Sequence, residues 1–211
     1  MKSATRVATS TIGVYAGLLG AIHGYFETLQ GNVVPGGIGI NAIGAPCQGD
    51  VVWHACLPAM TIVPSFIVTG ILAIIISLII VVWAGVFIQR KNGGLILILL
   101  SILMLLVGGG FIPTFAGIVA GVAGTGINTP LVFWRTRLSG SALRSLAKLW
   151  PWTLIVFVAW SLGGWFVGHF FNQVMINLSL VLFLVCNLGL PLLTVITGFA
   201  RDIDRDRIVK E

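Results

Sequence analysis

Three long runs of this chain, residues 51–89, 92–134 and 149–200, contain no Asp, Glu, Lys or Arg. A helix needs about 20 mostly apolar residues to cross the hydrocarbon core of a bilayer, and each run can hold at least one. Hydrophobic residues make up 57% of the chain and charged residues 9%, whereas a soluble domain carries about 25% charged residues. The composition excludes a soluble globule, a fibre and a disordered chain, and it predicts an integral membrane protein.

The apolar stretches predict an all-α fold, a polytopic transmembrane helical bundle that forms a single integral membrane domain over residues 1–211. The third and fourth predicted spans meet at the segment Gly108 to Pro113, and glycine and proline interrupt helices. A single span followed by a re-entrant loop over residues 94–133 is the alternative. The six predicted spans are residues 8–27, 62–88, 94–112, 114–133, 150–171 and 177–199.

The positive charges predict the orientation in the membrane. Cytoplasmic segments collect Lys and Arg, so we expect every basic cluster to lie inside. The clusters that flank residues 94–133 can both lie inside if this segment crosses twice, which gives six spans in the cell membrane with both termini cytoplasmic. Residues 28–61 then form a long external loop. The basic clusters are Lys2/Arg6, Arg90/Lys91, Arg135/Arg137, Arg144/Lys148 and Arg201/Arg205/Arg207/Lys210.

This distribution also accounts for the net charge of +6, so we expect the lipid bilayer, and no nucleic acid, as the partner of the basic residues. Residues 135–149 place leucines on one helical face and basic residues on another, which predicts an interfacial basic helix on the inner leaflet. Docking of a cytoplasmic partner there is an alternative. His23 and Glu27 interrupt the end of the first apolar run, so we expect a retained helix there rather than a signal peptide.

Glycines recur on one face of the first and fourth predicted helices. Small residues let two helix backbones approach closely, which is how helices associate within lipid. The pattern predicts packing of one helix on another within the chain, and a contact with a membrane partner subunit is the alternative. The packing glycines are Gly13, Gly17, Gly20 and Gly24 in the first helix and Gly117 and Gly121 in the fourth.

The predicted external loop is rich in glycine and almost uncharged, so we expect it to fold back as a cap over the helix ends. Cys47 and Cys56 lie in this loop with eight residues between them. Disulfides persist in oxidising compartments, and the two cysteines therefore predict a disulfide bond. A metal pair is less consistent with this spacing, because a tetrahedral site needs two further ligands.

The candidate ligand-binding residues are the polar groups of the spans and of the loop. His23 and Glu27 lie four residues apart on one helical face, with Gln30 three residues further. Ionisable groups within a span are costly unless they face a partner or a cavity. The alternative is that His23 and Glu27 have a purely structural role. The other candidates are His54 in the loop, His169 at the outer end of the fifth span and Asn187, one turn before Pro191, in the sixth.

These residues favour a small non-enzymatic membrane protein that binds or passes a small solute through an outward-facing polar cluster. An accessory or assembly subunit of a larger membrane complex is the second hypothesis. The third is a membrane metalloenzyme that uses His23, Glu27 and His54 as ligands, because imidazole and carboxylate suit a zinc-like cation. The sequence identifies no cofactor. A phosphate-binding loop and a Gly-x-Ser-x-Gly motif are both missing from it.

Overall fold

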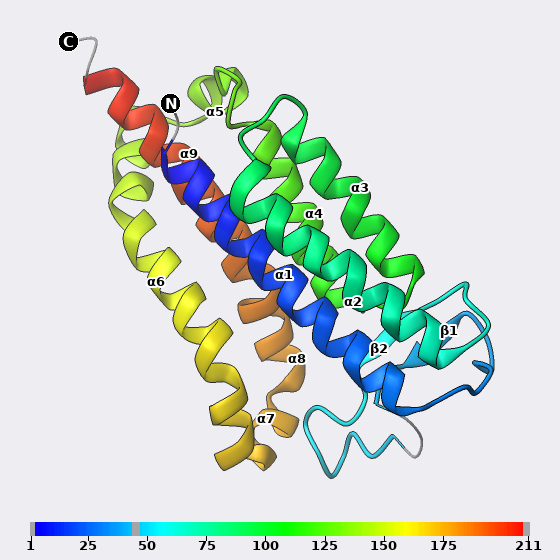
Figure 1. The fold of residues 1–211 in the computed structure, drawn as a ribbon. Helices are drawn as coiled ribbons and strands as arrows, with labels where there is room; N and C mark the ends of the chain where they lie inside the picture. Colours follow the sequence, from blue (N-terminus) through cyan, green and yellow to red (C-terminus); the bar gives the residue numbers. More distant parts are fainter. Residues whose placement is uncertain (1–2, 44–46, 209–211) are drawn as a thin grey trace.

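A computed structural model describes residues 3–43 and 47–208 of the chain. Helix α1 (Ser3–Leu29) runs through the bundle and contacts α2, α4, α6 and α9 (Figure 1). Small side chains and glycines predominate on its buried face. Gly17 and Gly24 lie against the backbone oxygens of Ser77 and Gly70, where an added Cβ would overlap. The glycine face of α1 therefore packs within the chain, mainly on α2.

Helix α2 (Phe66–Val82) continues through a π-helical turn, η1 (Trp83–Phe87), and is followed by α3 (Gly93–Leu106) and α4 (Phe111–Thr125). Helices α3 and α4 run antiparallel, because Gly94 packs on Gly121 at one end and Ser101 on Gly117 nearer the other. Helix α4 begins at Phe111, earlier than expected. Its proline is the third residue of the helix, where a missing N–H costs nothing. This antiparallel pair is what a double crossing requires, and the crossing itself stays a prediction.

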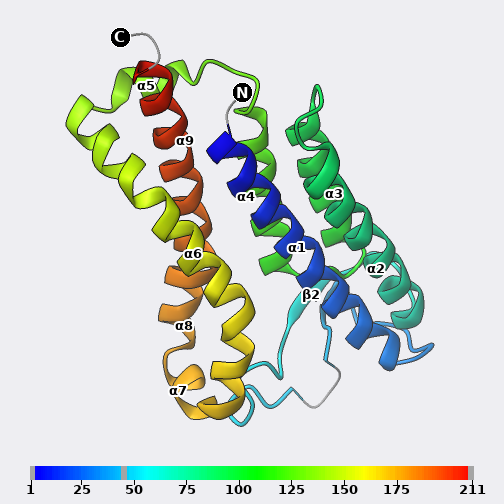
Figure 2. The ribbon, with the colours of Figure 1, turned by 60° about the vertical axis from the view of Figure 1, so that its left-hand side comes forward.

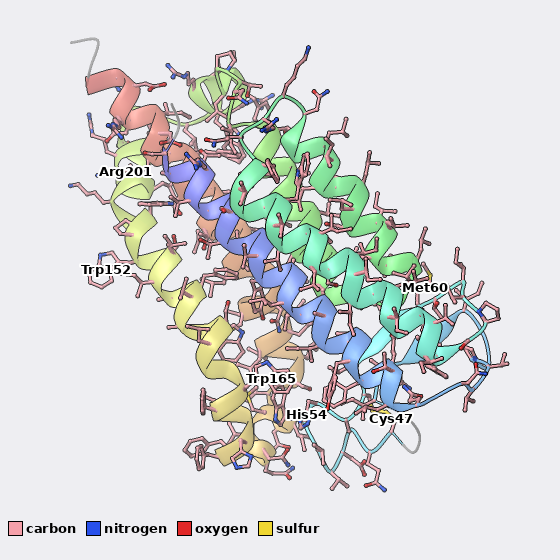
Figure 3. All side chains as sticks on the ribbon, viewed as in Figure 1. Cys47, His54, Met60, Trp152, Trp165 and Arg201 are labelled. Atoms are coloured by element: carbon pink, nitrogen blue, oxygen red, sulfur yellow. A yellow bond between two sulfur atoms is a disulfide. The ribbon has the colours of Figure 1, made fainter. Side chains whose placement is uncertain are left out.

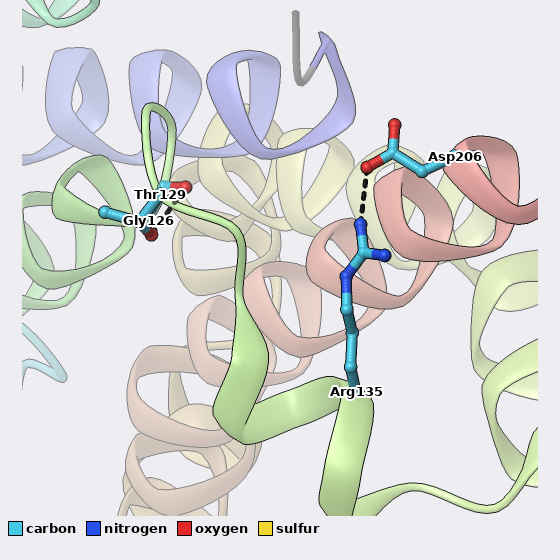
Figure 4. Close-up of polar contacts among 4 residues, drawn as sticks. All are labelled: Gly126, Thr129, Arg135 and Asp206. Atoms are coloured by element: carbon cyan, nitrogen blue, oxygen red, sulfur yellow. Dashed lines mark hydrogen bonds and ion pairs between the residues drawn. The ribbon is translucent and has the colours of Figure 1, made fainter.

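The basic stretch after α4 is divided differently from the expected interfacial helix over 135–149. A short helix, α5 (Val132–Arg137), is followed by α6 (Gly140–Phe170), which continues through Pro151 without a break. Residues 140–149 are therefore the first turns of a long helix. A proline inside a helix removes one backbone hydrogen bond, and here the remaining bonds and the packing against α9 hold the helix together. Arg135 of α5 forms an exposed ion pair with Asp206 at 2.6 Å (Figure 4).

The last predicted span is built from four pieces, α7 (Asn172–Asn177), α8 (Ser179–Leu182), the π-helical η2 (Phe183–Gly189) and α9 (Leu190–Ile208). The π-helical turns end just before Pro191, which cannot donate a backbone hydrogen bond. At the other end of α9, the Asp202 carboxylate accepts hydrogen bonds from the backbone N–H groups of Ala4 (3.0 Å) and Thr5 (2.8 Å). Asp202 thus satisfies free N–H groups in the first turn of α1.

The loop between α1 and α2 contains a short antiparallel ladder of β1 (Gly39–Asn41) and β2 (Pro58–Met60), with Gly39 opposite Met60. The predicted disulfide between Cys47 and Cys56 is present, with a Cα–Cα distance of 5.3 Å. This loop lies at the end of the bundle opposite the two termini (Figures 1 and 2).

Four helical segments are long and apolar enough to cross a membrane, namely Ser3–Leu29, Phe66–Phe87, Gly140–Phe170 and Ser179–Arg207. Helices α3 and α4 are shorter, with 14 and 15 residues; at about 1.5 Å per residue each extends only about 21–23 Å. The structure is therefore a helical membrane bundle. Its described Lys and Arg residues belong to the α1 start, the α2–α3 turn, α5, the first turns of α6 and the last turns of α9, all at the end that carries the termini (Figure 3).

Candidate functional site

The two polar residues that interrupt the first apolar run are both buried. His23 is 5% exposed and Glu27 is 0% exposed, although both lie in the last two turns of α1. Neither carboxylate oxygen of Glu27 has a hydrogen-bond partner among the described residues, and the same holds for His23 Nδ1. A buried charge without a partner is strongly unfavourable. A charged Glu27 therefore needs a compensating cation, and a neutral one needs a proton.

The triple-glycine turn between α3 and α4 lies directly on these two side chains. Gly108 (φ 97°) and Gly110 (φ 85°) adopt conformations that L side chains rarely adopt. A Cβ added to Gly108 would overlap the Glu27 carboxylate, and one added to Gly110 would overlap the His23 ring. The turn thus needs glycine for its backbone and also for the space that the two side chains occupy. The sequence predicts only an interruption between two helices at these glycines.

The helices around Glu27 offer no charge that could compensate it. Within the described chain α2, η1, α3 and α4 contain no titratable side chain. His23 lies one helical turn away on the same face. Neither carboxylate oxygen of Glu27 forms a hydrogen bond with it among the described residues.

His23 also lines a cavity of about 370 Å³ between α1, the start of α4, α6 and the α7–η2 segment. Few polar side chains contribute to it, among them Ser161 of α6, Ser179 of α8 and Asn187 of η2. A concave, mostly apolar site of this size with a few convergent polar groups is typical of small-molecule binding sites. Aromatic rings form much of the wall: Tyr15, Trp53, Phe111, Trp160, Trp165 and Phe183.

The loop between α1 and α2 contributes Trp53 and Pro58 to the cavity wall, at the end of the bundle opposite the termini. The Asn172 side chain accepts a hydrogen bond from Trp53 N (3.0 Å) and donates one to Val51 O (2.8 Å). The Trp53 indole occupies the space beside Gly168, where any Cβ would overlap it, and stacks edge-to-face on Trp165 at 5.2 Å. These contacts fix the loop to the end of α6 and to the start of α7.

His54 lies in this cap beside the cavity, with its ring 5.5 Å from that of Trp165 (Figure 3). Its Nδ1 is buried without a hydrogen-bond partner among the described residues, and burial lowers the pKa of His54. The neutral ring is therefore the form that the cap accommodates.

The remaining candidates do not join the cavity lining. The Gln30 side chain donates hydrogen bonds to Asn41 O (3.1 Å) and Ala42 O (2.6 Å), so it fastens the loop. His169 is exposed at the end of α6, with its ring against Phe170. Within residues 3–43 and 47–208, no three His, Cys, Asp or Glu side chains are close enough together to hold a metal ion.

The aromatic wall could not be anticipated from the sequence. Trp160 and Trp165 are two of many apolar residues in α6, and nothing in their spacing distinguishes the face that lines a cavity from the face that contacts lipid. No family model matches the chain, and no curated protein or solved structure shows significant similarity to it. A functional proposal must therefore rest on the cavity and the residues around it.

Proposed function

We propose that this chain is a small membrane protein that binds a small solute in the cavity between α1, α4, α6 and the α7–η2 segment. The observation that carries the proposal is the part of the cavity wall that the loop between α1 and α2 supplies. A disulfide-bonded loop inserts Trp53 beside Gly168 and so adds a third tryptophan to the aromatic lining. A loop that served only to join two helices would need neither the inserted ring nor the cavity below it.

The proposal includes an orientation, with the cap outside and both termini in the cytoplasm. It is supported by the basic residues at the opposite end of the bundle. Cysteine labelling of intact cells would test it in a Cys186→Ala background, with single cysteines at Gln89, Ser139 and Gln173. Only the cysteine at position 173 should react with an impermeant reagent. Reaction at position 139 would exclude the double crossing of residues 94–133.

Solute binding can be tested with two neighbouring glycines of α6. Gly164 lines the cavity, whereas a Cβ added at Gly163 would meet no atom within 4 Å. Gly164→Leu should fill the cavity, and Gly163→Leu makes the same change to the helix without doing so. The protein would be extracted in mild detergent and analysed by native mass spectrometry for small molecules that co-purify.

We expect a bound small molecule on the original protein and on Gly163→Leu, and its loss from Gly164→Leu. Equal retention by both variants would place the molecule elsewhere. Protein partners in stoichiometric amounts, with no small molecule, would instead support the accessory-subunit hypothesis.

A further inference from the structure

The cavity wall is mostly apolar, but its aromatic rings give it an electrostatic preference. Three tryptophans, one tyrosine and two phenylalanines contribute to the lining, and no Lys or Arg of the described chain does. The face of an aromatic ring carries partial negative charge and attracts cations, most strongly for tryptophan. Aromatic enclosures of this type suit organic ammonium groups, whereas an anion would have no Lys or Arg in the lining to balance its charge.

The buried acid Glu27 follows the lining residue His23 by four residues, a rise of about 6 Å along the helix axis. Gly108 packs directly against its carboxylate, and the Glu27 side chain is fully buried. That leaves no room for a hydrated metal ion at the carboxylate, so a proton is the occupant that fits.

We propose that the cavity takes an organic cation, and that Glu27 gives up its proton when the cation binds. The inference rests on the solute-binding function proposed above and names the chemical class of that solute. In the empty protein the neutral acid avoids a buried charge. When the cation enters, the O–H bond of Glu27 breaks and the proton leaves through the His23 imidazole to water. The carboxylate then balances the charge of the cation, and the total charge of the site is unchanged.

His23 is suited to pass this proton, because its ring borders the cavity and shares a helix face with Glu27. An imidazole can accept a proton at one nitrogen and release one from the other. Other titratable groups are few in this part of the described chain: Tyr15, Tyr25, Asp50, His54, His169 and Cys186. Asp50 is exposed in the loop, which makes it the matched control for Glu27.

The test uses benzyltrimethylammonium together with its neutral analogue neopentylbenzene, which has the same shape. Binding to the purified full-length protein in detergent would be followed by quenching of tryptophan fluorescence, since three tryptophans line the cavity. Proton release would be measured by calorimetry in two buffers with different ionisation enthalpies. The variants are Glu27→Gln, which mimics the neutral acid permanently, and Asp50→Asn.

We expect the cation to bind at least about tenfold more tightly than its neutral analogue, a preference of about 1.4 kcal/mol, and to release close to one proton. Glu27→Gln should remove both the preference and the proton release while it still binds neopentylbenzene. Asp50→Asn should retain both. Binding of neopentylbenzene without a preference for the cation would overturn this inference and leave the cavity as a solute site. The inference is also overturned if Glu27→Gln behaves like the original protein, and binding of neither probe would overturn both proposals.

Discussion

Gly110 offers a direct test of the packing between the triple-glycine turn and the side chains of His23 and Glu27. Its backbone has φ 85° and ψ 155°, a region that is almost exclusive to glycine and costs other residues about 1–3 kcal/mol. In Gly110→Ala the new methyl group must also displace the buried His23 ring, and overpacking of this kind costs about 1–3 kcal/mol. The variant should therefore lose about 2–6 kcal/mol. Gly31→Ala is the control, because Gly31 has φ 76° with no atom within 4 Å of an added Cβ.

The assay is thermal unfolding of the detergent-purified variants, followed by far-ultraviolet circular dichroism. A chain of this size loses about 2–4 °C in Tm per kcal/mol. Both variants carry the cost of a positive φ, so the overpacking alone should make Gly110→Ala melt at least about 2 °C below Gly31→Ala. The steric part can be isolated in a His23→Ala background, where the methyl group has room. There the cost of Gly110→Ala should fall by at least about 1 kcal/mol, a coupling that a double-mutant cycle measures. Equal melting of the two glycine variants, or strictly additive effects, would refute the packing argument.

Three further predictions concern the two ends of the bundle. Cys47→Ser/Cys56→Ser should destabilise the protein by about 2–3 kcal/mol through the lost loop constraint, and mass spectrometry without reduction should find the joined peptides only in the original protein. Asp202→Ala should cost about 1–2 kcal/mol in thermal unfolding, because it removes a helix cap; Asp206→Ala, which breaks an exposed ion pair, should cost less than about 1 kcal/mol. His54 has a folded-state pKa below its ordinary value of 6.5, so its contribution to stability is present above pH 6.5 and is lost as the pH falls through the folded pKa. Tryptophan fluorescence should report opening of the cap on acidification, and His54→Phe should abolish that change.

The helical regions could be predicted because hydropathy and charge determine where a chain can enter a bilayer. All six predicted apolar spans contain helix, and four segments are long enough to cross. The boundaries were less predictable. Pro151 reads as a break between an interfacial helix and a span, yet α6 continues through it, since packing against α9 outweighs one missing hydrogen bond. At Pro191 the helix does change: the turns just before this proline, in η2, are π-helical.

Only part of the candidate site could be predicted from the sequence. His23 and Glu27 could be paired because four residues bring two side chains to one helix face. Their contact with the glycine turn could not be predicted, because it depends on how α3 and α4 fold back against α1. The cap depends on contacts of longer range still. Trp53 finds its place beside Gly168, more than a hundred residues away in the chain, and neither residue has a neighbour in sequence that indicates it.

The bonds from Asp202 to the start of α1 connect residues that are 197 and 198 positions apart. During synthesis the ribosome adds Asp202 only after the other helices of the bundle have been synthesised. Until then, the first turn of α1 has no carboxylate to accept its N–H groups, and α1 can still tilt or slide against its neighbours. When α9 packs into the bundle, Asp202 fixes the N-terminal end of α1. Assembly of this protein should therefore finish at the helix that was made first, and truncation of the last turns of α9 should loosen α1 before it affects α6.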